Sequence, residues 1–220
     1  IFPGVDTYGY TNNSNPSNLI AFNHDLYFSA EGSSGLELYR YDPVSGVTTL
    51  IDVNPSGSSV PTNLVVFNSA LYFLAESSVY GVELWKYDGT SLTVVEVRPG
   101  AASSNPGSLV AYTGALYFSA DDGTNGIELW SYDGSSLSLV DNLNPSGSSS
   151  PSGLNVHAGA LYFTANDGSG EALFEYDGVS VDPAPVVFGV IGSLYRNVVA
   201  ITATATAVAN FPITADTDFG

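Results

Sequence analysis

Cysteine and methionine are absent from the sequence, and basic residues are scarce: 4 lysines and arginines stand against 22 aspartates and glutamates. Without cysteine, disulfides and thiolate metal sites are excluded. The formal net charge of −18 repels nucleic-acid phosphates and anionic lipids, so we expect no nucleic-acid partner. No apolar run reaches the roughly 18 residues of a membrane helix, which argues against membrane insertion.

The remaining composition favours an extracellular or cell-surface protein. Only 12% of the residues are charged, so the surface must consist mainly of Ser, Thr, Asn and Gly with scattered carboxylates. Such a chain suits secretion, or an environment rich in divalent cations or salt. The sequence starts at Ile1 instead of methionine, and we therefore expect a mature chain from which a signal peptide has been removed.

An internal repeat of 45 residues organises the chain. The triplet Leu-Tyr-Phe recurs on this step, and a Pro-x-x-Leu precedes each copy. An aromatic-tipped run and a Tyr-Asp pair follow each copy. The triplets start at Leu26, Leu71, Leu116 and Leu161. Four anchors in phase over four copies define a structural unit, with repeats at 16–60, 61–105, 106–150 and 151–182.

Each repeat holds four strand-sized segments separated by Gly, Asn, Asp and Ser. In the third repeat they are 109–112, 115–120, 127–132 and 136–141. Four short strands per 40–50 residues, repeated, are typical of β-propeller blades. The sequence thus predicts an all-β propeller with four clear blades, whose inner strands are apolar on both sides because neighbouring blades cover both faces.

The chain ends predict a fifth, composite blade. Residues 183–220 carry a weak echo of the repeat and a period-2 stretch from Thr202 to Ala207. Residues 1–15 fall where a fourth strand belongs, since a step of 45 residues back from Leu50-Ile51-Asp52 reaches Val5-Asp6-Thr7. Joining the first and last strands closes a ring and leaves no open edge. The alternative is a four-bladed ring with a β-prone tail that adds to another subunit.

The segments Gly81–Thr90 and Gly126–Gly134 resemble a bacterial repeat named for its Glu-Leu-Trp…Asp-Gly-Thr signature. The similarity extends over roughly 16–178. Repeats one and four depart from it, with Tyr39 and Phe174 in place of Trp. The resemblance implies a propeller-like repeat of large secreted or surface-attached proteins, and it implies no catalytic residue.

Carboxylates recur once per repeat and invite two interpretations. In the first interpretation, the carboxylates form a ring of metal or substrate ligands or catalytic acids. In the second, each Asp-Gly pair closes the turn between the third and fourth strands, and the Asp side chain hydrogen-bonds to backbone groups of that turn. We favour the turn, because catalysis generally needs one asymmetric constellation. The residues are Glu37, Glu83, Glu128, Asp42, Asp88, Asp133 and Asp177.

Two loops offer clustered oxygen ligands of the kind that calcium accepts. They supply Asp121, Asp122 and Asn125 in the third repeat, and Asn166 and Asp167 in the fourth. The alternative is a pair of solvated hairpin loops. Calcium is therefore a possible cofactor, and no other is predicted. The two histidines, His24 and His157, fall at different repeat positions and form no symmetric metal site.

Aromatic residues give a possible carbohydrate site in each blade. Trp85 and Trp130 would stack on sugars, although packing between blades is the more ordinary use of such side chains. The tyrosines beside the Asp turns, which we expect to be exposed, are somewhat better candidates: Tyr41, Tyr87, Tyr132 and Tyr176.

The sequence as a whole predicts a non-enzymatic, extracellular structural or adhesive module that self-associates through its terminal strands into filaments or arrays. A lectin with one site per blade is the alternative. A glycoside-active enzyme fits less well, because the visible carboxylates repeat and do not diverge into a pair.

Overall fold

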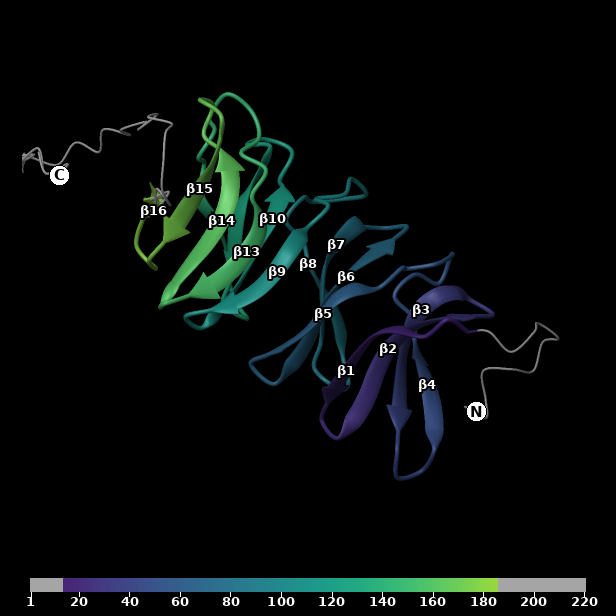
Figure 1. The fold of residues 1–220 in the computed structure, drawn as a ribbon. Helices are drawn as coiled ribbons and strands as arrows, with labels where there is room; N and C mark the ends of the chain where they lie inside the picture. Colours follow the sequence, from purple (N-terminus) through teal and green to yellow (C-terminus); the bar gives the residue numbers. More distant parts are fainter. Residues whose placement is uncertain (1–13, 186–220) are drawn as a thin grey trace, which may run out of the picture. The chain divides into compact units, whose positions relative to one another are not determined.

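A computed structural model describes residues 14–185 as four antiparallel sheets of four strands each (Figure 1). The first sheet contains β1 (Ser17–Phe22), β2 (Asp25–Gly32), β3 (Gly35–Asp42) and β4 (Val47–Ile51). The second contains β5 (Thr62–Phe67), β6 (Ala70–Ser77), β7 (Gly81–Tyr87) and β8 (Leu92–Val95). In both sheets the strands lie in chain order.

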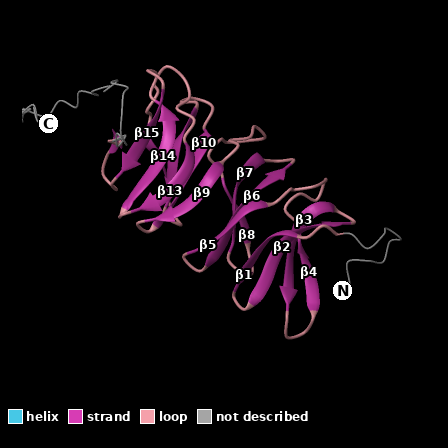
Figure 2. Cartoon of the chain, in the orientation of Figure 1, coloured by secondary structure: helices cyan, strands magenta, loops and turns pink. Residues whose placement is uncertain are grey.

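The third and fourth sheets repeat this arrangement. The third contains β9 (Gly107–Tyr112), β10 (Ala115–Asp121), β11 (Ile127–Tyr132) and β12 (Leu137–Asp141). The fourth contains β13 (Ser152–His157), β14 (Ala160–Asn166), β15 (Glu171–Tyr176) and β16 (Val181–Pro183). The described residues consist of strands and loops only (Figure 2), and no membrane-spanning helix is found among them. The predicted all-β class and four blade-like units are confirmed.

The first strand of every sheet carries a bulge at one residue with positive φ. Pairing with the second strand shifts register there, and the residue is Asn18, Asn63, Ser108 or Gly153, with φ of 52°, 53°, 54° and 63°. Asn and Gly tolerate this left-handed conformation at little cost. A small or polar residue two places after the repeat's proline is thus a backbone requirement.

Each sheet has two apolar faces, which we call the front and the back. The front face carries the Leu, Phe and Ala of the second strand and the two aromatic residues of the third. The back face carries the aromatic residue that ends the first strand, the Tyr of the second strand and the Leu of the third. In the second sheet, for example, Phe73 and Trp85 lie on the front, and Tyr72 and Leu84 on the back.

The core consists of back-to-front contacts between consecutive sheets. The front of the second sheet packs against Tyr27 and Leu38 on the back of the first. The same pairing joins the second sheet to the third and the third to the fourth. Inner strands are consequently buried on both sides, as in β6, where Ala70 to Ala75 are all buried. This confirms the prediction made from their continuous apolar sequence.

Ring closure is not visible within residues 14–185. The front of the first sheet forms a separate cluster of Phe28, Ala30 and Tyr39, and no cluster of described residues joins it to the fourth sheet. The predicted composite blade falls on residues 1–13 and 186–220, which lie outside the described residues. The last described strand, β16, ends at Pro183.

Candidate functional site

The most buried charged groups are three glutamates on the third strands. Glu37, Glu83 and Glu128 are each 0% exposed. The Glu83 carboxylate accepts hydrogen bonds from the backbone N–H of Val97 (3.1 Å), the backbone N–H of Ser104 (3.0 Å) and the Ser104 hydroxyl. Burial raises the pKa of Glu83, while the bonds from Ser104 and Val97 act in the opposite direction.

The other two glutamates have the same partners one repeat away. Glu37 accepts from the backbone and hydroxyl of Ser59, and Glu128 from those of Ser149. Burial raises the pKa of both glutamates, opposed mainly by the hydrogen bonds from the serine. We call each Glu–Ser pair a latch, because the serine lies in the linker that leads to the next sheet.

The latch serine also contacts the following sheet. The carbonyl of Ser59 accepts from the N–H of Glu76 at 2.8 Å, and the carbonyl of Ser104 from that of Asp121 at 2.9 Å. One serine therefore binds a glutamate behind it and a strand ahead of it. The sequence analysis weighed these glutamates, together with the aspartates, as ligands or acids against a structural role and favoured the structural role. It did not predict the serine partner, although Ser59, Ser104 and Ser149 recur on the same 45-residue step.

The repeated aspartates close turns between the third and fourth strands. Asp133 accepts from the backbone N–H groups of Ser135 and Ser136 at 2.8 and 2.7 Å. These hydrogen bonds, with one from the Ser135 hydroxyl, lower the pKa of Asp133. Asp42, Asp88 and Asp177 make equivalent bonds. The structure thus uses these carboxylates as the turn interpretation predicts.

The two tryptophans pack between sheets. Trp85 is 6% exposed and Trp130 is 9% exposed. Their Nε1–H groups donate to the carbonyls of Ala75 (3.0 Å) and Ala120 (3.1 Å) on the adjacent strand. Buried indoles with satisfied donors offer no open face to a sugar ring.

The tyrosines next to the turns are less exposed than predicted. For Tyr87 the expectation of an exposed ring is wrong, because Tyr87 is 9% exposed and its hydroxyl donates to the Gly89 carbonyl. Tyr132 is half-buried and likewise donates to the Gly134 carbonyl. Tyr176 is half-buried against Tyr112 and Tyr117 of the third sheet, and Tyr41 is half-buried beside the cluster on the front of the first sheet.

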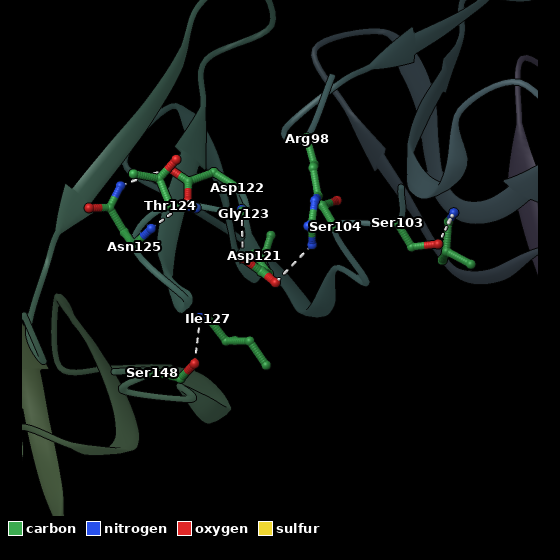
Figure 3. A network of polar contacts seen from close by, with 12 residues as sticks. Arg98, Ser103, Ser104, Asp121, Asp122, Gly123, Thr124, Asn125, Ile127 and Ser148 are labelled. Carbon is green, nitrogen blue, oxygen red and sulfur yellow. Dashed lines mark hydrogen bonds and ion pairs between the residues drawn. The ribbon is translucent and has the colours of Figure 1, made fainter. Parts of the chain in front are cut away.

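The carboxylates of the acidic loop in the third repeat bind groups of the protein itself (Figure 3). Asp121 forms an ion pair with Arg98 at 3.1 Å. Asp122 accepts from the N–H groups of Thr124 and Asn125, both at 2.8 Å. In the fourth repeat, Asn166 and Asp167 accept from backbone N–H groups of the same loop. Among residues 14–185, no three acidic, His or Cys side chains gather to form a metal site.

The surface formed by residues 14–185 includes two shallow depressions. One, of about 260 Å³, is lined by the bulge residues and leucines of β5, β9 and β13, including Asn63, Leu64 and Leu109, and no charged residue borders it. The other, of about 270 Å³, lies between the 124–126 loop and the 142–148 linker.

A chain of amide hydrogen bonds borders the second depression. Asp122 can only accept, which orients the Asn125 amide toward it at 2.7 Å; Asn125 in turn accepts from Asn142 Nδ2 at 3.0 Å. Asn142 Oδ1 is thereby left as the buried side-chain atom without a partner in the described part of the chain. Donor groups of a polar ligand or a water molecule are the natural complement to this oxygen.

The comparisons with known proteins establish no family. No protein-family model matches the sequence, and no curated protein matches it. Solved structures that are similar in part include "Bacteroides ovatus Xyloglucan PUL GH43B", with 19% identity over 80% of this chain and a TM-score of 0.40. They also include the β-propeller domain of the trilobed protease from Pyrococcus furiosus, with 13% identity over 78% of this chain and a TM-score of 0.36. The chain spans 41% of the length of the first and 69% of the second. Likenesses this distant carry no argument about activity.

Proposed function

We propose that this chain is a non-enzymatic structural or adhesive module that works outside the cell or at its surface. The proposal is supported by the structural contacts that the repeated polar and aromatic side chains make. The glutamates are buried in latches, the aspartates close turns and the indoles fill the core. The repeated glutamates, aspartates and tryptophans thus have structural roles, as expected of a scaffold.

We further propose that the terminal segments complete a fifth blade or exchange between molecules. Support comes from the packing of the second, third and fourth sheets, each of which lays its front face on the back face of the preceding sheet. The first sheet carries the same front-face residues, among them Phe28 and Tyr39. Residues 1–15 and 183–220 are those the repeat leaves over to cover it, within the molecule or on a neighbour.

Sedimentation velocity of the full chain over a hundredfold range of concentration, with electron microscopy of the same samples, tests this assembly. We expect species that grow with concentration. Thr204→Pro should reduce growth, because proline removes a backbone donor from the period-2 segment, whereas the control Thr204→Ser should not. A monomer at every concentration, unchanged by proline, overturns both assembly and closure. A monomer that Thr204→Pro destabilises supports closure and overturns assembly.

A carbohydrate-binding function is the second candidate, favoured by the polar depression beside Asn125 and Asn142. Amide and hydroxyl groups are suited to sugar hydroxyls. A glycan array should then show binding that Asn142→Ala abolishes. If the chain binds no glycan on the array, carbohydrate binding is ruled out. Hydrolysis of chromogenic glycosides by the purified chain would contradict the non-enzymatic proposal.

A further inference from the structure

The polar depression of the third repeat is bordered by residues at which this repeat departs from the first two. The linker residue before the backbone donor to the buried glutamate is acidic in the first two repeats, Asp52 and Glu96, and is Asn142 in the third. Asn125 likewise takes the place of Tyr80, an aromatic residue that packs against the core of the second sheet. Residues shared by the repeats build the fold, so residues that differ in one repeat are better candidates for a ligand site.

The hydrogen bonds between these residues can run in only one direction. Burial opposes the ionisation of Asp122, but hydrogen bonds from the backbone N–H groups of Asn125 and Thr124 outweigh burial and lower the pKa of this carboxyl. An ionised carboxylate cannot donate, so Asn125 turns its Nδ2 toward Asp122, at 2.7 Å (Figure 3). Asn125 Oδ1 then accepts from Asn142 Nδ2 at 3.0 Å, and Asn142 Oδ1 is left without a donor. We call Asp122, Asn125 and Asn142 the amide relay.

The amide relay ends in a hydrogen-bond acceptor that lacks a partner. Asn142 lines the depression of about 270 Å³, and its Oδ1 is buried. A ligand therefore reaches this oxygen with one small donor group, such as a hydroxyl or an ammonium group, which takes the place of a water molecule. A carboxylate group has no proton to donate, and it is repelled by Asp122 and by the net charge of −18.

The rest of the lining suits a sugar. Thr124 and Ser146 are exposed, and their hydroxyls can donate or accept. Of the described residues that line the depression, none is charged or aromatic. The volume is slightly below the roughly 300–1,000 Å³ of pockets for drug-sized ligands, which leaves room for about one sugar ring.

We propose that the depression binds a saccharide through one of its hydroxyl or amino groups, and that Asp122 is a positioning residue that excludes anionic groups from this contact. Asp122 does not line the depression and acts through Asn125 and Asn142. The inference rests on the proposed carbohydrate-binding function. It adds the chemistry of the ligand: a group that can donate to Asn142, and not a group that can only accept.

A glycan array that carries hexosides in three matched forms tests this chemistry. The parent form offers a hydroxyl, which donates and accepts; the amino form offers an ammonium group, which only donates; the uronate form offers a carboxylate, which only accepts. We expect the unmodified chain to bind the parent and amino forms, and to bind the uronate form roughly tenfold more weakly, the equivalent of one hydrogen bond. Asn142→Ala should abolish the binding of all three.

The variant Asp122→Asn should reverse the amide relay. Its side-chain oxygen still accepts from the loop backbone, but its Nδ2 donates, so the amides of Asn125 and Asn142 flip and present N–H groups to the ligand. Binding of the amino form should fall roughly tenfold, binding of the parent form should change by less than about threefold, and binding of the uronate form should rise. Asn125→Ala cuts the relay and should likewise weaken the preference for the amino form. Asp141→Asn is the matched control, because it removes an exposed carboxylate beside Asn142 and leaves the relay intact.

The possible failures are distinguishable. Uronate binding equal to that of the amino form, or a change of specificity in Asp141→Asn as large as in Asp122→Asn, would overturn the role of the relay while carbohydrate binding stands. Glycan binding that Asn142→Ala leaves unchanged would overturn the site. The absence of any bound glycan would rule out carbohydrate binding and this inference with it, and would leave the first proposal, a structural module, intact.

Discussion

Replacing Glu83 by alanine is the sharpest test of how the sheets are held together. The carboxylate is 0% exposed and accepts from two backbone N–H groups and one hydroxyl. Alanine removes all three acceptor contacts and leaves the N–H groups of Val97 and Ser104 buried without partners. Each hydrogen bond to a charged group is worth about 1.5–3 kcal/mol, and each orphaned buried donor costs about 1–3 kcal/mol.

The desolvation of the carboxylate offsets part of this loss, because burial raises the pKa of Glu83 and so disfavours its charged form. We expect a net decrease of about 3–5 kcal/mol in the free energy of unfolding, the usual cost of breaking a buried charged contact from one side. Glu83→Gln retains one acceptor oxygen and should lose about 1–3 kcal/mol.

Urea unfolding followed by circular dichroism measures this difference directly. Glu76→Ala is the matched control, because Glu76 is an exposed glutamate on the adjacent strand of the same sheet. The control should change stability by less than about 0.5 kcal/mol. If Glu83→Ala also stays within that range, the latch does not hold the linker to the sheet and the reasoning is refuted.

Three further predictions concern pH, backbone conformation and salt. Because the pKa values of Glu37, Glu83 and Glu128 are raised, these groups bind protons more tightly in the folded chain than in the unfolded chain. Their contribution to stability should therefore be lost as pH rises from about 4.5 through the folded-state pKa values. Thermal melts of a variant with all three glutamates changed to glutamine should show a weaker dependence of stability on pH. Gly81→Ala should destabilise the fold by about 3 kcal/mol, because Gly81 has a φ of +66° and an added Cβ would lie 2.8 Å from the Ser103 backbone nitrogen. Gly114→Ala should cost only about 1 kcal/mol, because Gly114 has a φ of +81° but no atom lies within 4 Å of the added Cβ. Equal losses of stability in denaturant titrations would contradict the steric argument. Sodium chloride should raise the melting temperature, since a net charge of −18 repels itself less when screened, and a melting temperature independent of salt would show that this repulsion is negligible.

The repeat was readable from the sequence because its anchors have local causes. Gly and Asp mark turns through backbone conformation and through side-chain bonds to the nearest amides, so Asp133 and Gly134 locate a hairpin on their own. Continuous apolar runs such as Leu116 to Ala120 indicate strands that are buried on both faces. These signals placed all four strands of the third repeat to within about two residues.

The candidate site was harder to predict, because its contacts join distant residues. Glu83 and Ser104 are 21 positions apart, and nothing in the sequence around either residue indicates that they form a buried hydrogen bond. Tyr87 looked like a surface residue beside a turn, yet it is covered by the neighbouring sheet. Whether a side chain is buried depends on which other sheet packs against it, and the sequence of a single strand does not contain that information.

The sequence alone therefore determined the strands, the turns and the 45-residue unit, because each follows from steric and hydrogen-bonding preferences within a few residues of chain. Only the tertiary structure decided which face of one sheet covers which face of the next, and that Glu37, Glu83 and Glu128 are buried in latches and are not presented to solvent. A carboxylate is ligand, acid or structural contact according to the donors that surround it, and those donors come from another part of the fold.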